Sequence, residues 1–390
     1  MSGFEFHTVG RIIFGRGQFA RAGELAAGLG RKSALIVFNG SQSAADQLVQ
    51  QLAVANMRGV TSRQRGEPTV EDVDRMVEVA RSNGCDMVIG LGGGSAIDAA
   101  KAVAGLLGNG GSALDYMEVV GKGQKITRPA APWIAIPSTA GTGAEATRNA
   151  VIGYPPKQFK ASLRSEHLLA RIALVDPQLG VDVPPDVTAR SGMDALCQCI
   201  ESYTSNSAQP LTDALALDGV RRASRSLLRA FKDGSDLDAR EDMALAALFS
   251  GIALANAGLG AVHGFAAPLG AGFPIPHGTA CAALLPHVMA ANVQALRQAD
   301  TAHPVLARYA SIGRILMDDP TKADEPAIEG GIGVVRRLCG DLRIPSLRPF
   351  GLDKDHVPAV SNLARKSSSM RYNPIQLSEE ALNTILSEAL

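Results

Sequence analysis

The chain has 390 residues, of which 46% are hydrophobic and 19% are charged, so it holds enough apolar material for more than one packed core. Its 38 basic and 38 acidic residues cancel, which argues against nucleic acid or an anionic membrane surface as a partner. Aromatic residues make up 4% of the chain, too few for a surface on which bases stack.

The cysteines and the N-terminal residues bear on the compartment. Five cysteines, an odd number set mostly in apolar runs, predict reduced and mostly buried thiols. The first residues, MSGFEFHTVGRIIFG, show no charged region followed by a long apolar one, so we expect no signal peptide. No stretch reaches the roughly 18 uninterrupted apolar residues that a membrane helix needs. We therefore expect a cytoplasmic protein.

Strand-like and helix-like segments alternate over the first 180 residues or so. Thr69 with Asp72 resembles an N-terminal cap, apolar residues then recur at helical spacing, and Asn83-Gly84 ends that helix. This alternation predicts a parallel α/β layer. We expect buried strands at 34–38, 86–90, 133–137 and 172–175.

The pattern changes after Val183. Prolines open a long helical segment, and two more segments with helical period follow, at 184–205, 212–231 and 238–258. We expect a boundary near 180–185, between a dinucleotide-binding α/β domain at 1–182 and a helical domain at 183–390.

A glycine-rich loop follows the strand at 86–90 and opens a helix. Gly92, Gly93, Gly94 and Ser95 allow a close backbone approach, and the free N–H groups of the helix N-terminus attract an anion. The loop is therefore a candidate pyrophosphate cradle, although it is neither GxGxxG nor a P-loop. The alternative is a tight strand–helix turn. Asp98, expected in the first helical turn, is a further candidate cofactor-binding residue; the alternative is that it complements the helix dipole and is structural.

A second loop, at 137–149, follows the strand at 133–137. Its Ser138, Thr139 and Thr142 are candidate donors to a phosphate or to a ring amide, because ligands of parallel sheets bind at the carboxyl ends of strands. An ordinary polar turn is the alternative.

The helical region contains a candidate metal set. Asp194 and Gln198 lie four residues apart, on one face of an expected helix. His263 is the first residue and His277 the last but one of an apolar, Gly- and Pro-rich segment at 263–278. An aspartate with two histidines is a common divalent-metal set, but an amide oxygen binds zinc or iron more weakly than imidazole. The alternative is a site without metal, in which Gln198 holds Asp194 or the substrate by hydrogen bonds.

Together these motifs resemble the iron-containing (group III) alcohol dehydrogenase family. The resemblance implies a Rossmann-like N-terminal domain, an all-helical C-terminal domain as in the dehydroquinate synthase-like fold, and an active-site cleft between them. It also implies NAD(P)-dependent interconversion of an alcohol and a carbonyl compound. The matching segments are GGGSAIDAAK (92–101), IPSTAGTGAEAT (136–147), ALVDPQL (173–179), SGMDAL (191–196), ESYTS (201–205), DALAL (213–217), NAGLGAVHG (256–264) and IPHG (275–278).

The resemblance also assigns roles. It implies that the glycine loop cradles the pyrophosphate, that the second loop lines the adenine, phosphate or nicotinamide side, and that four residues ligate a metal. The residues so implied are Gly92, Gly93, Gly94, Ser95, Ser138, Thr139, Thr142, Gly143, Lys160 and Leu179 for the cofactor, and Asp194, Gln198, His263 and His277 for the metal.

The chain departs from the family pattern at several positions. Gln198 stands where most members have histidine, and Ala267 where many have a pocket histidine often given a proton-transfer role. Asn39 replaces the aspartate that NAD-preferring members place against the ribose, so a 2′-phosphate would not be repelled. Arg371 belongs to a segment that closes over the pocket in relatives, and it meets either a substrate anion or a surface partner.

The sequence therefore predicts hydride transfer between NAD or NADP and a small alcohol or carbonyl substrate. Asp194, His263 and His277 would be catalytic, with Fe²⁺ or Zn²⁺ polarising the substrate oxygen. A metal-independent dehydrogenase and a catalytically silent nucleotide-binding homologue are the alternatives. We expect a homodimer or higher homo-oligomer, with strand pairing through residues 11–15 as one contact.

Overall fold

The computed structural model describes residues 3–157 and 159–390. They form two compact units, which we call the α/β unit and the helical unit. The α/β unit comprises His7–Thr139 and Gly143–Asp182. The helical unit comprises Val183–Leu390 together with Ala140–Thr142 and the N-terminal residues up to Phe6.

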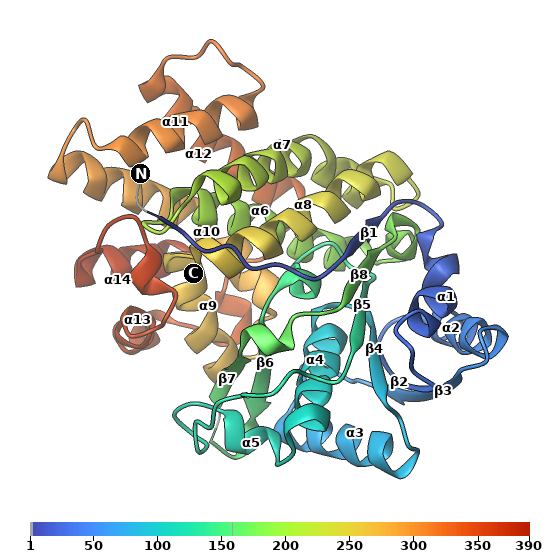
Figure 1. The fold of residues 1–390 in the computed structure, drawn as a ribbon. Helices are drawn as coiled ribbons and strands as arrows, with labels where there is room; N and C mark the ends of the chain where they lie inside the picture. Colours follow the sequence, from blue (N-terminus) through green and yellow to red (C-terminus); the bar gives the residue numbers. More distant parts are fainter. Residues whose placement is uncertain (1–2, 158) are drawn as a thin grey trace. The chain divides into compact units, whose positions relative to one another are not determined.

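The α/β unit is built on a six-stranded sheet in which all neighbouring strands are parallel, in the order β1-β8-β5-β4-β2-β3 (Figure 1). The predicted parallel α/β layer is therefore confirmed. The strands are β1 (Ile12–Phe14), β2 (Ser33–Phe38), β3 (Arg58–Arg63), β4 (Met87–Gly92), β5 (Trp133–Pro137) and β8 (Ile172–Val175). A separate antiparallel hairpin is formed by β6 (Asn149–Tyr154) and β7 (Phe159–Arg164).

Helices cover both faces of the sheet, as a parallel sheet requires. Every residue of β2, β4, β5 and β8 is buried, and alternate side chains enter two different apolar cores. One core is shared with α1 (Ala22–Ala27) and α2 (Gln42–Val54), and the other with α3 (Val70–Ser82) and α4 (Gly94–Asn109), while a short α5 (Ala113–Tyr116) follows. The carboxyl ends of β2, β4 and β5 thus meet at one edge of a rigid layer.

Local sequence signals explain several of these elements. The capping box expected from Thr69 and Asp72 is present at the start of α3, and Gly84 adopts φ +62° just beyond its end. The segment at 11–15 supplies β1, which pairs in parallel with β8 of the same chain and lies at the edge of the sheet. Three strands were not predicted. They are β3, β6 and β7, which are only partly buried.

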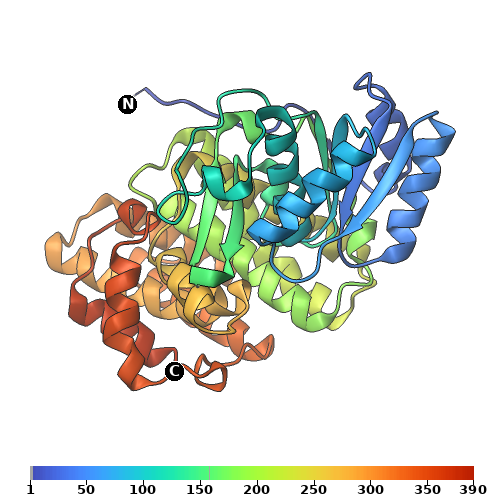
Figure 2. The same ribbon diagram turned by 90° about the horizontal axis from the view of Figure 1, so that it is seen from below.

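The helical unit is centred on α6 (Pro185–Thr204), which packs against α7 (Pro210–Lys232), α8 (Leu237–Ala257) and α10 (His277–Ala299) (Figures 1 and 2). Pro185 occupies the first helical position of α6, where its missing N–H costs nothing. The remaining helices are α9 (Ala261–Gly272), α11 (Pro304–Met317), α12 (Asp324–Asp341), α13 (Val357–Arg365) and α14 (Glu379–Glu388).

Helix α10 is long and apolar enough to cross a membrane by length and composition alone, and 72% of its most apolar window is buried within the protein. The pair formed by α8 and α9 passes the same test, but it is bent by 99°. The apolar side chains of α10 belong to the core of the helical unit, where they pack with those of α6 and α9.

Candidate functional site

Helix α6 presents three buried polar side chains on one face. Asp194, Gln198 and Glu201 follow one another at intervals of one helical turn, with exposures of 2, 3 and 5%. Their neighbours Met193, Leu196 and Ile200 belong to the apolar core. Burial of three such groups is costly unless each is paired, so their partners indicate what the face does.

The segment predicted from residues 263–278 folds as two helices joined by a short turn. His263 lies in the first turn of α9, and His277 is the first residue of α10. The turn between them carries Pro274 and Pro276, which cannot continue a helix. Cys281 follows His277 by one turn of α10 and is fully buried.

Four donor atoms from these helices converge. Asp194 Oδ1 lies 3.3 Å from His263 Nε2 and 3.6 Å from His277 Nε2. Cys281 Sγ lies 3.7 Å from His263 Nε2 and 3.6 Å from His277 Nε2. One donor atom from each of the four residues lies within 4.8 Å of the others. We call Asp194, His263, His277 and Cys281 the donor cluster.

Glu201 fixes the orientation of His263. Its Oε2 accepts a hydrogen bond of 2.6 Å from His263 Nδ1, and its Oε1 accepts one of 2.7 Å from the backbone N–H of Val262. With the proton on Nδ1, the lone pair of Nε2 points at the donor cluster. Sequence reasoning missed this role, although the position of Glu201 seven residues after Asp194 on the same helix was a usable signal.

Gln198, predicted as a metal ligand, makes hydrogen bonds to Ser250 and Asp194. Its Oε1 accepts a hydrogen bond of 2.7 Å from Ser250 Oγ, and its Nε2 lies 3.4 Å from Asp194 Oδ2. The amide therefore steadies the outer carboxylate oxygen and leaves Oδ1 toward the two imidazoles. This is the arrangement of the alternative interpretation, in which Gln198 holds Asp194 by a hydrogen bond.

The cluster joins a buried carboxylate to two imidazoles. Burial opposes ionisation of Asp194, but His277 and His263 hold its pKa below the ordinary value. Burial raises the pKa of the Cys281 thiol well above its ordinary value, which a bound cation would reverse. A carboxylate, two imidazole nitrogens and a sulfur, one imidazole backed by Glu201, are the donors that a divalent transition metal prefers. The donor set thus fits the metal that the sequence predicts.

In the α/β unit, the glycine loop has the predicted shape. Gly92 ends β4 with φ +143°, and α4 begins at Gly94, so Ser95 lies in its first turn. The backbone N–H of Gly93 donates 2.8 Å to Oδ1 of Asn39, which follows β2. A Cβ on Gly92 would come 2.1 Å from that oxygen, so only glycine fits there.

The second loop lies against the first. Ser138 N donates 2.8 Å to Gly92 O, and a Cβ on Gly93 would lie 3.2 Å from Thr139 Oγ1. Gly143 turns the loop with φ +59°, while Thr142 belongs to the helical unit. Leu179 lies in a short 3₁₀ helix after β8 and packs against the core shared with α2. The strand ends thus bring together Asn39, Gly92, Gly93, Ser138 and Thr139.

Two residues expected near the cofactor have protein partners. Asp98 lies beyond the first turn of α4, and its Oδ2 accepts 3.1 Å from Val151 N while Lys101 Nζ lies 3.5 Å from its Oδ1. Lys160, on β7, forms an ion pair with Glu67. Asp98 therefore ties the hairpin to α4, the structural role that the sequence left open for it.

Lys101 ends the motif at 92–101, and no role was predicted for it from the sequence. It is fully buried, and its Nζ donates to Ala144 O at 2.8 Å, Thr147 Oγ1 at 2.7 Å and Asn149 O at 2.7 Å. These bonds hold the end of the second loop against α4. The signal in the sequence was a lysine within an otherwise apolar helical run.

The structure also places Ala267 and Arg371, at which the chain departs from the family pattern or which that pattern singles out, and the remaining histidine of α10. Ala267 lies on α9, one turn after His263, and is exposed. Arg371 stacks on Tyr372, with its guanidinium carbon 4.6 Å from the ring centroid. His287, on α10, forms a 2.8 Å contact with Glu388 and lies outside the donor cluster.

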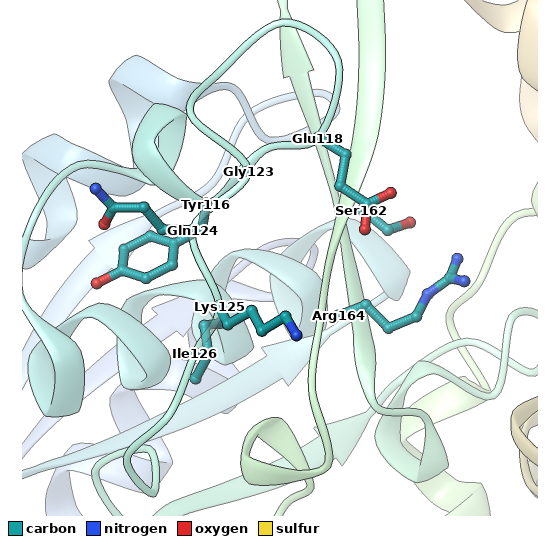
Figure 3. A pocket seen from close by; sticks show the side chains of 8 residues that line it. All are labelled: Tyr116, Glu118, Gly123, Gln124, Lys125, Ile126, Ser162 and Arg164. Carbon is teal, nitrogen blue, oxygen red and sulfur yellow. The ribbon is translucent and has the colours of Figure 1, made fainter.

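A small polar pocket in the α/β unit contains none of the predicted site residues. Figure 3 shows the side chains of Lys125 and Arg164 at its lower part and those of Glu118 and Ser162 above. Its walls come from the loop after α5 and from β7. The predicted cofactor and metal residues thus lie at the glycine loop and the donor cluster instead.

A parallel sheet with a glycine-rich strand–helix turn, and a helical unit with a carboxylate–imidazole cluster, define a nicotinamide-dependent oxidoreductase. The chain belongs to the iron-containing alcohol dehydrogenase family. The model of iron-containing alcohol dehydrogenase matches residues 10–177, and the C-terminal model of the Fe-containing alcohol dehydrogenase family matches 188–390. The resemblance stated from the motifs is confirmed.

Individual relatives agree with this assignment. Choline dehydrogenase of Bacillus subtilis is 34% identical over 387 residues, which cover 98% of this chain and 93% of the relative. The solved structure of 1,3-propanediol oxidoreductase superposes with a TM-score of 0.92 at 31% identity and full coverage of both chains. That of sulfoacetaldehyde reductase from Bifidobacterium kashiwanohense, in complex with NAD⁺, gives 0.87 at 26% identity, covering 99% of this chain and 98% of that one. The protein is an alcohol dehydrogenase by family.

Proposed function

We propose that this protein interconverts a small alcohol and its aldehyde or ketone by hydride transfer to or from NAD or NADP, with a divalent metal ion held by Asp194, His263 and His277. The observation that carries the proposal is the convergence of Asp194 Oδ1 with the two imidazole Nε2 atoms, at 3.3 and 3.6 Å. Such a set, once loaded, supplies Lewis acidity toward the alcohol or carbonyl oxygen.

The protein's own residues hold this cluster ready. Glu201 keeps His263 in one tautomer, and Gln198 keeps Asp194 in one rotamer, so neither donor has to reorganise. Both groups are buried from bulk water in an apolar core, which strengthens their electrostatic effect. His277, whose side chain is 43% exposed, marks the side from which a small substrate reaches the cluster.

The nicotinamide cofactor is proposed to bind at the carboxyl ends of β2, β4 and β5. Support comes from the glycine loop, whose backbone N–H groups and helix N-terminus suit a pyrophosphate. The hydroxyls of Ser138 and Thr139, adjoining that loop, are proposed further donors. Gly143 and Leu179 are assigned to the cofactor by family resemblance alone.

We propose that NADP is accepted as well as NAD. Asn39 brings no negative charge to the end of β2, and Arg63 adds a positive one beside it. The Arg63 guanidinium lies 5.4 Å from the centroid of the Phe38 ring and donates 3.1 Å to Gly40 O. An arginine near this strand end is how related sheets accommodate a 2′-phosphate, whereas a carboxylate there repels it.

The assembly and compartment are also proposals. We propose a homodimer or higher oligomer in the cytoplasm. Support for the compartment is that all five cysteines are free thiols. Support for the oligomer is that β1 lies at the edge of the sheet, where a second copy can add a strand.

The proposal is tested by substituting Asp194→Ala and His263→Ala. Turnover on a panel of alcohols, aldehydes and ketones should fall by at least about a hundredfold, as expected when one group that stabilises a developing oxyanion is lost. Cofactor affinity, measured by fluorescence titration with NADH and NADPH, should stay within about twofold of the native value, since the substituted groups lie in the helical unit.

The matched control is His287→Ala, because His287 lies on the same helix as His277 but contacts Glu388 instead. It should retain native turnover. Full activity after exhaustive chelation, with no metal found by elemental analysis, would refute the metal and leave the metal-independent dehydrogenase. Saturable cofactor binding with no oxidation across the panel would refute the proposed reaction itself.

A further inference from the structure

We propose that Cys281 is the fourth metal ligand of this chain, in place of residue 198, so that the donor cluster binds Zn²⁺ through one carboxylate, two imidazoles and one thiolate. The inference rests on the proposed metal-dependent function and goes beyond it. It names a ligand that the family resemblance does not supply, and with it the kind of metal.

The spacing of the donor atoms supports a tetrahedral ion. Zinc bonds of the usual lengths at tetrahedral angles place an imidazole nitrogen about 3.3 Å from a carboxylate oxygen and about 3.6 Å from a thiolate sulfur. The observed nitrogen–oxygen separations are 3.3 and 3.6 Å. The observed nitrogen–sulfur separations are 3.7 and 3.6 Å. Four of the six donor–donor separations thus match those of such an ion, and the remaining two are below 4.8 Å.

Gln198 already makes hydrogen bonds to protein groups. Its carbonyl oxygen, the atom that would ligate, accepts a hydrogen bond from Ser250, and its amide nitrogen lies toward Asp194. Swapping the two amide atoms would put two acceptors, Gln198 Oε1 and Asp194 Oδ2, 3.4 Å apart. The hydrogen-bond network therefore favours Gln198 as a support for Asp194 and leaves one ligand position to another residue.

Cys281 is placed to fill that position. It follows His277 by one turn of α10, just as Gln198 follows Asp194 by one turn of α6. Residue 198 on α6 no longer supplies an imidazole, and Cys281 supplies a sulfur from α10, which packs against α6. The sulfur is fully buried, so it is protected from oxidants in solvent.

A second set, Cys197 with Glu201 and His263, is less suitable. Glu201 Oε2 lies 2.6 Å from His263 Nδ1, which is a hydrogen-bond length and well below the roughly 3.3 Å edge of a tetrahedral zinc site. Cys197 Sγ lies 4.0 Å from the same Nδ1. It therefore faces the side of His263 that Glu201 already occupies.

A thiolate changes which metals the site prefers. Sulfur ligands favour zinc and other soft or borderline ions over Mg²⁺ and Mn²⁺, and zinc lies above ferrous iron in the general affinity order. Four protein ligands would complete a tetrahedral shell, so a substrate oxygen would bind as a fifth ligand, which zinc sites accommodate. His277, whose side chain is 43% exposed, is the ligand from whose side we expect it to enter.

The test is to strip the full-length protein with a chelator and titrate it with Co²⁺ under anaerobic conditions. Thiolate coordination gives a near-ultraviolet sulfur-to-cobalt charge-transfer band, and four-coordinate cobalt gives intense visible bands. We expect both in the native protein, and X-ray absorption of the zinc form should show one sulfur at about 2.3 Å. In Cys281→Ser the charge-transfer band and the sulfur shell should be lost. Zinc affinity should fall by more than the roughly 10–100-fold that loss of an outer partner costs.

Cys197→Ser is the matched control, because Cys197 is equally buried and also near His263 but on its Nδ1 side. It should keep the charge-transfer band. Cys281→His should bind cobalt in the visible spectrum without that band, which covers the case in which the serine variant does not fold. A band that survives in Cys281→Ser, or that vanishes in Cys197→Ser, overturns the inference alone. A native protein that binds neither cobalt nor zinc overturns the proposed metal-dependent function with it.

Discussion

The glycine loop and three of the four residues of the donor cluster were predicted from motifs, yet the two regions are built in different ways. The loop is positioned by strand register, because β2, β4 and β5 are parallel neighbours whose ends meet at one edge. The cluster is positioned by three helices whose contributing residues span 194 to 281. In the loop, a Cβ on Gly92 would lie 2.1 Å from Asn39 Oδ1, so a side chain there has no room. In the cluster, Cys281, one turn along α10 from His277, is proposed to take the position that residue 198 leaves.

The two regions also differ in which buried side chains hold them in place. The α/β unit holds its second loop through the buried Lys101, whereas the helical unit holds its donors through Glu201 and Gln198. Perturbing the first set should therefore appear as lost stability. Perturbing the second should appear as lost metal affinity.

The largest effect is expected for Lys101→Met. The substitution removes three short hydrogen bonds to the second loop and leaves Asp98 without its nearby cation, so it should destabilise the α/β unit by about 3–5 kcal/mol. Trp133 is the chain's single tryptophan and lies in β5, so its fluorescence reports unfolding of this unit. Lys122→Met, which removes an exposed ion pair with Asp115, should leave that transition unchanged. Equal transitions in both variants would show that Lys101 does not hold the loop.

Glu145 predicts a pH dependence of the same unit. Burial raises the pKa of this carboxyl to about 7, from an ordinary value of 4.5. Because the folded state binds the proton more tightly, its contribution to stability is complete below about pH 4.5 and is lost as the pH rises through about 7. A rise of the Glu145 pKa from 4.5 to about 7 on folding corresponds to about 3 kcal/mol of folding free energy.

Glu145→Gln should remove this dependence. The tryptophan-monitored unfolding midpoint of the native protein should fall between pH 5 and pH 8 by several degrees more than that of the variant. If the two proteins show the same shift with pH, the carboxyl does not titrate in this window in the folded state.

Much of the α/β unit followed from periodicity. The strands at 34–38 and 133–137 were predicted because they are uniformly apolar, and the turn at Gly92 because consecutive glycines stand between a strand and a helix. The strands β3, β6 and β7 were not predicted. They are only partly buried, and their strand character comes from pairing with neighbours that the local sequence does not reveal.

The donor cluster was predicted in part. Asp194, His263 and His277 were recognised by residue type, but the roles of Glu201, Ser250 and Cys281 depend on which side chains face each other across helices. Cys281 was read as a buried thiol, which it is, and nothing local distinguishes a buried thiol from a ligand. Contacts between residues far apart in the sequence decide that question.

A third, smaller effect tests the support of His263. In Glu201→Gln one of the two acceptors becomes a donor, so either Val262 N or His263 Nδ1 faces a like group. Zinc affinity, measured by competition with a chromophoric chelator, should drop by roughly 10–100-fold. Glu388→Gln, which alters a carboxylate–histidine contact outside the cluster, should leave it unchanged. Native affinity in Glu201→Gln would mean that His263 keeps its orientation by packing alone.

The smallest effect concerns the cofactor loop, where Asn39→Asp is the sharpest change available. The carboxylate can still accept the hydrogen bond from Gly93 N, so the loop should keep its shape while a negative charge is added at the ribose. The ratio of kcat/KM for NADP to that for NAD should fall by about tenfold, a difference of about 1.4 kcal/mol. Arg63→Gln should also lower this ratio, because it removes a positive charge beside Gly40 where Asn39→Asp adds a negative one. If neither variant moves the ratio, the 2′-phosphate does not bind at the end of β2, and the glycine loop would have to be read as the pyrophosphate site alone.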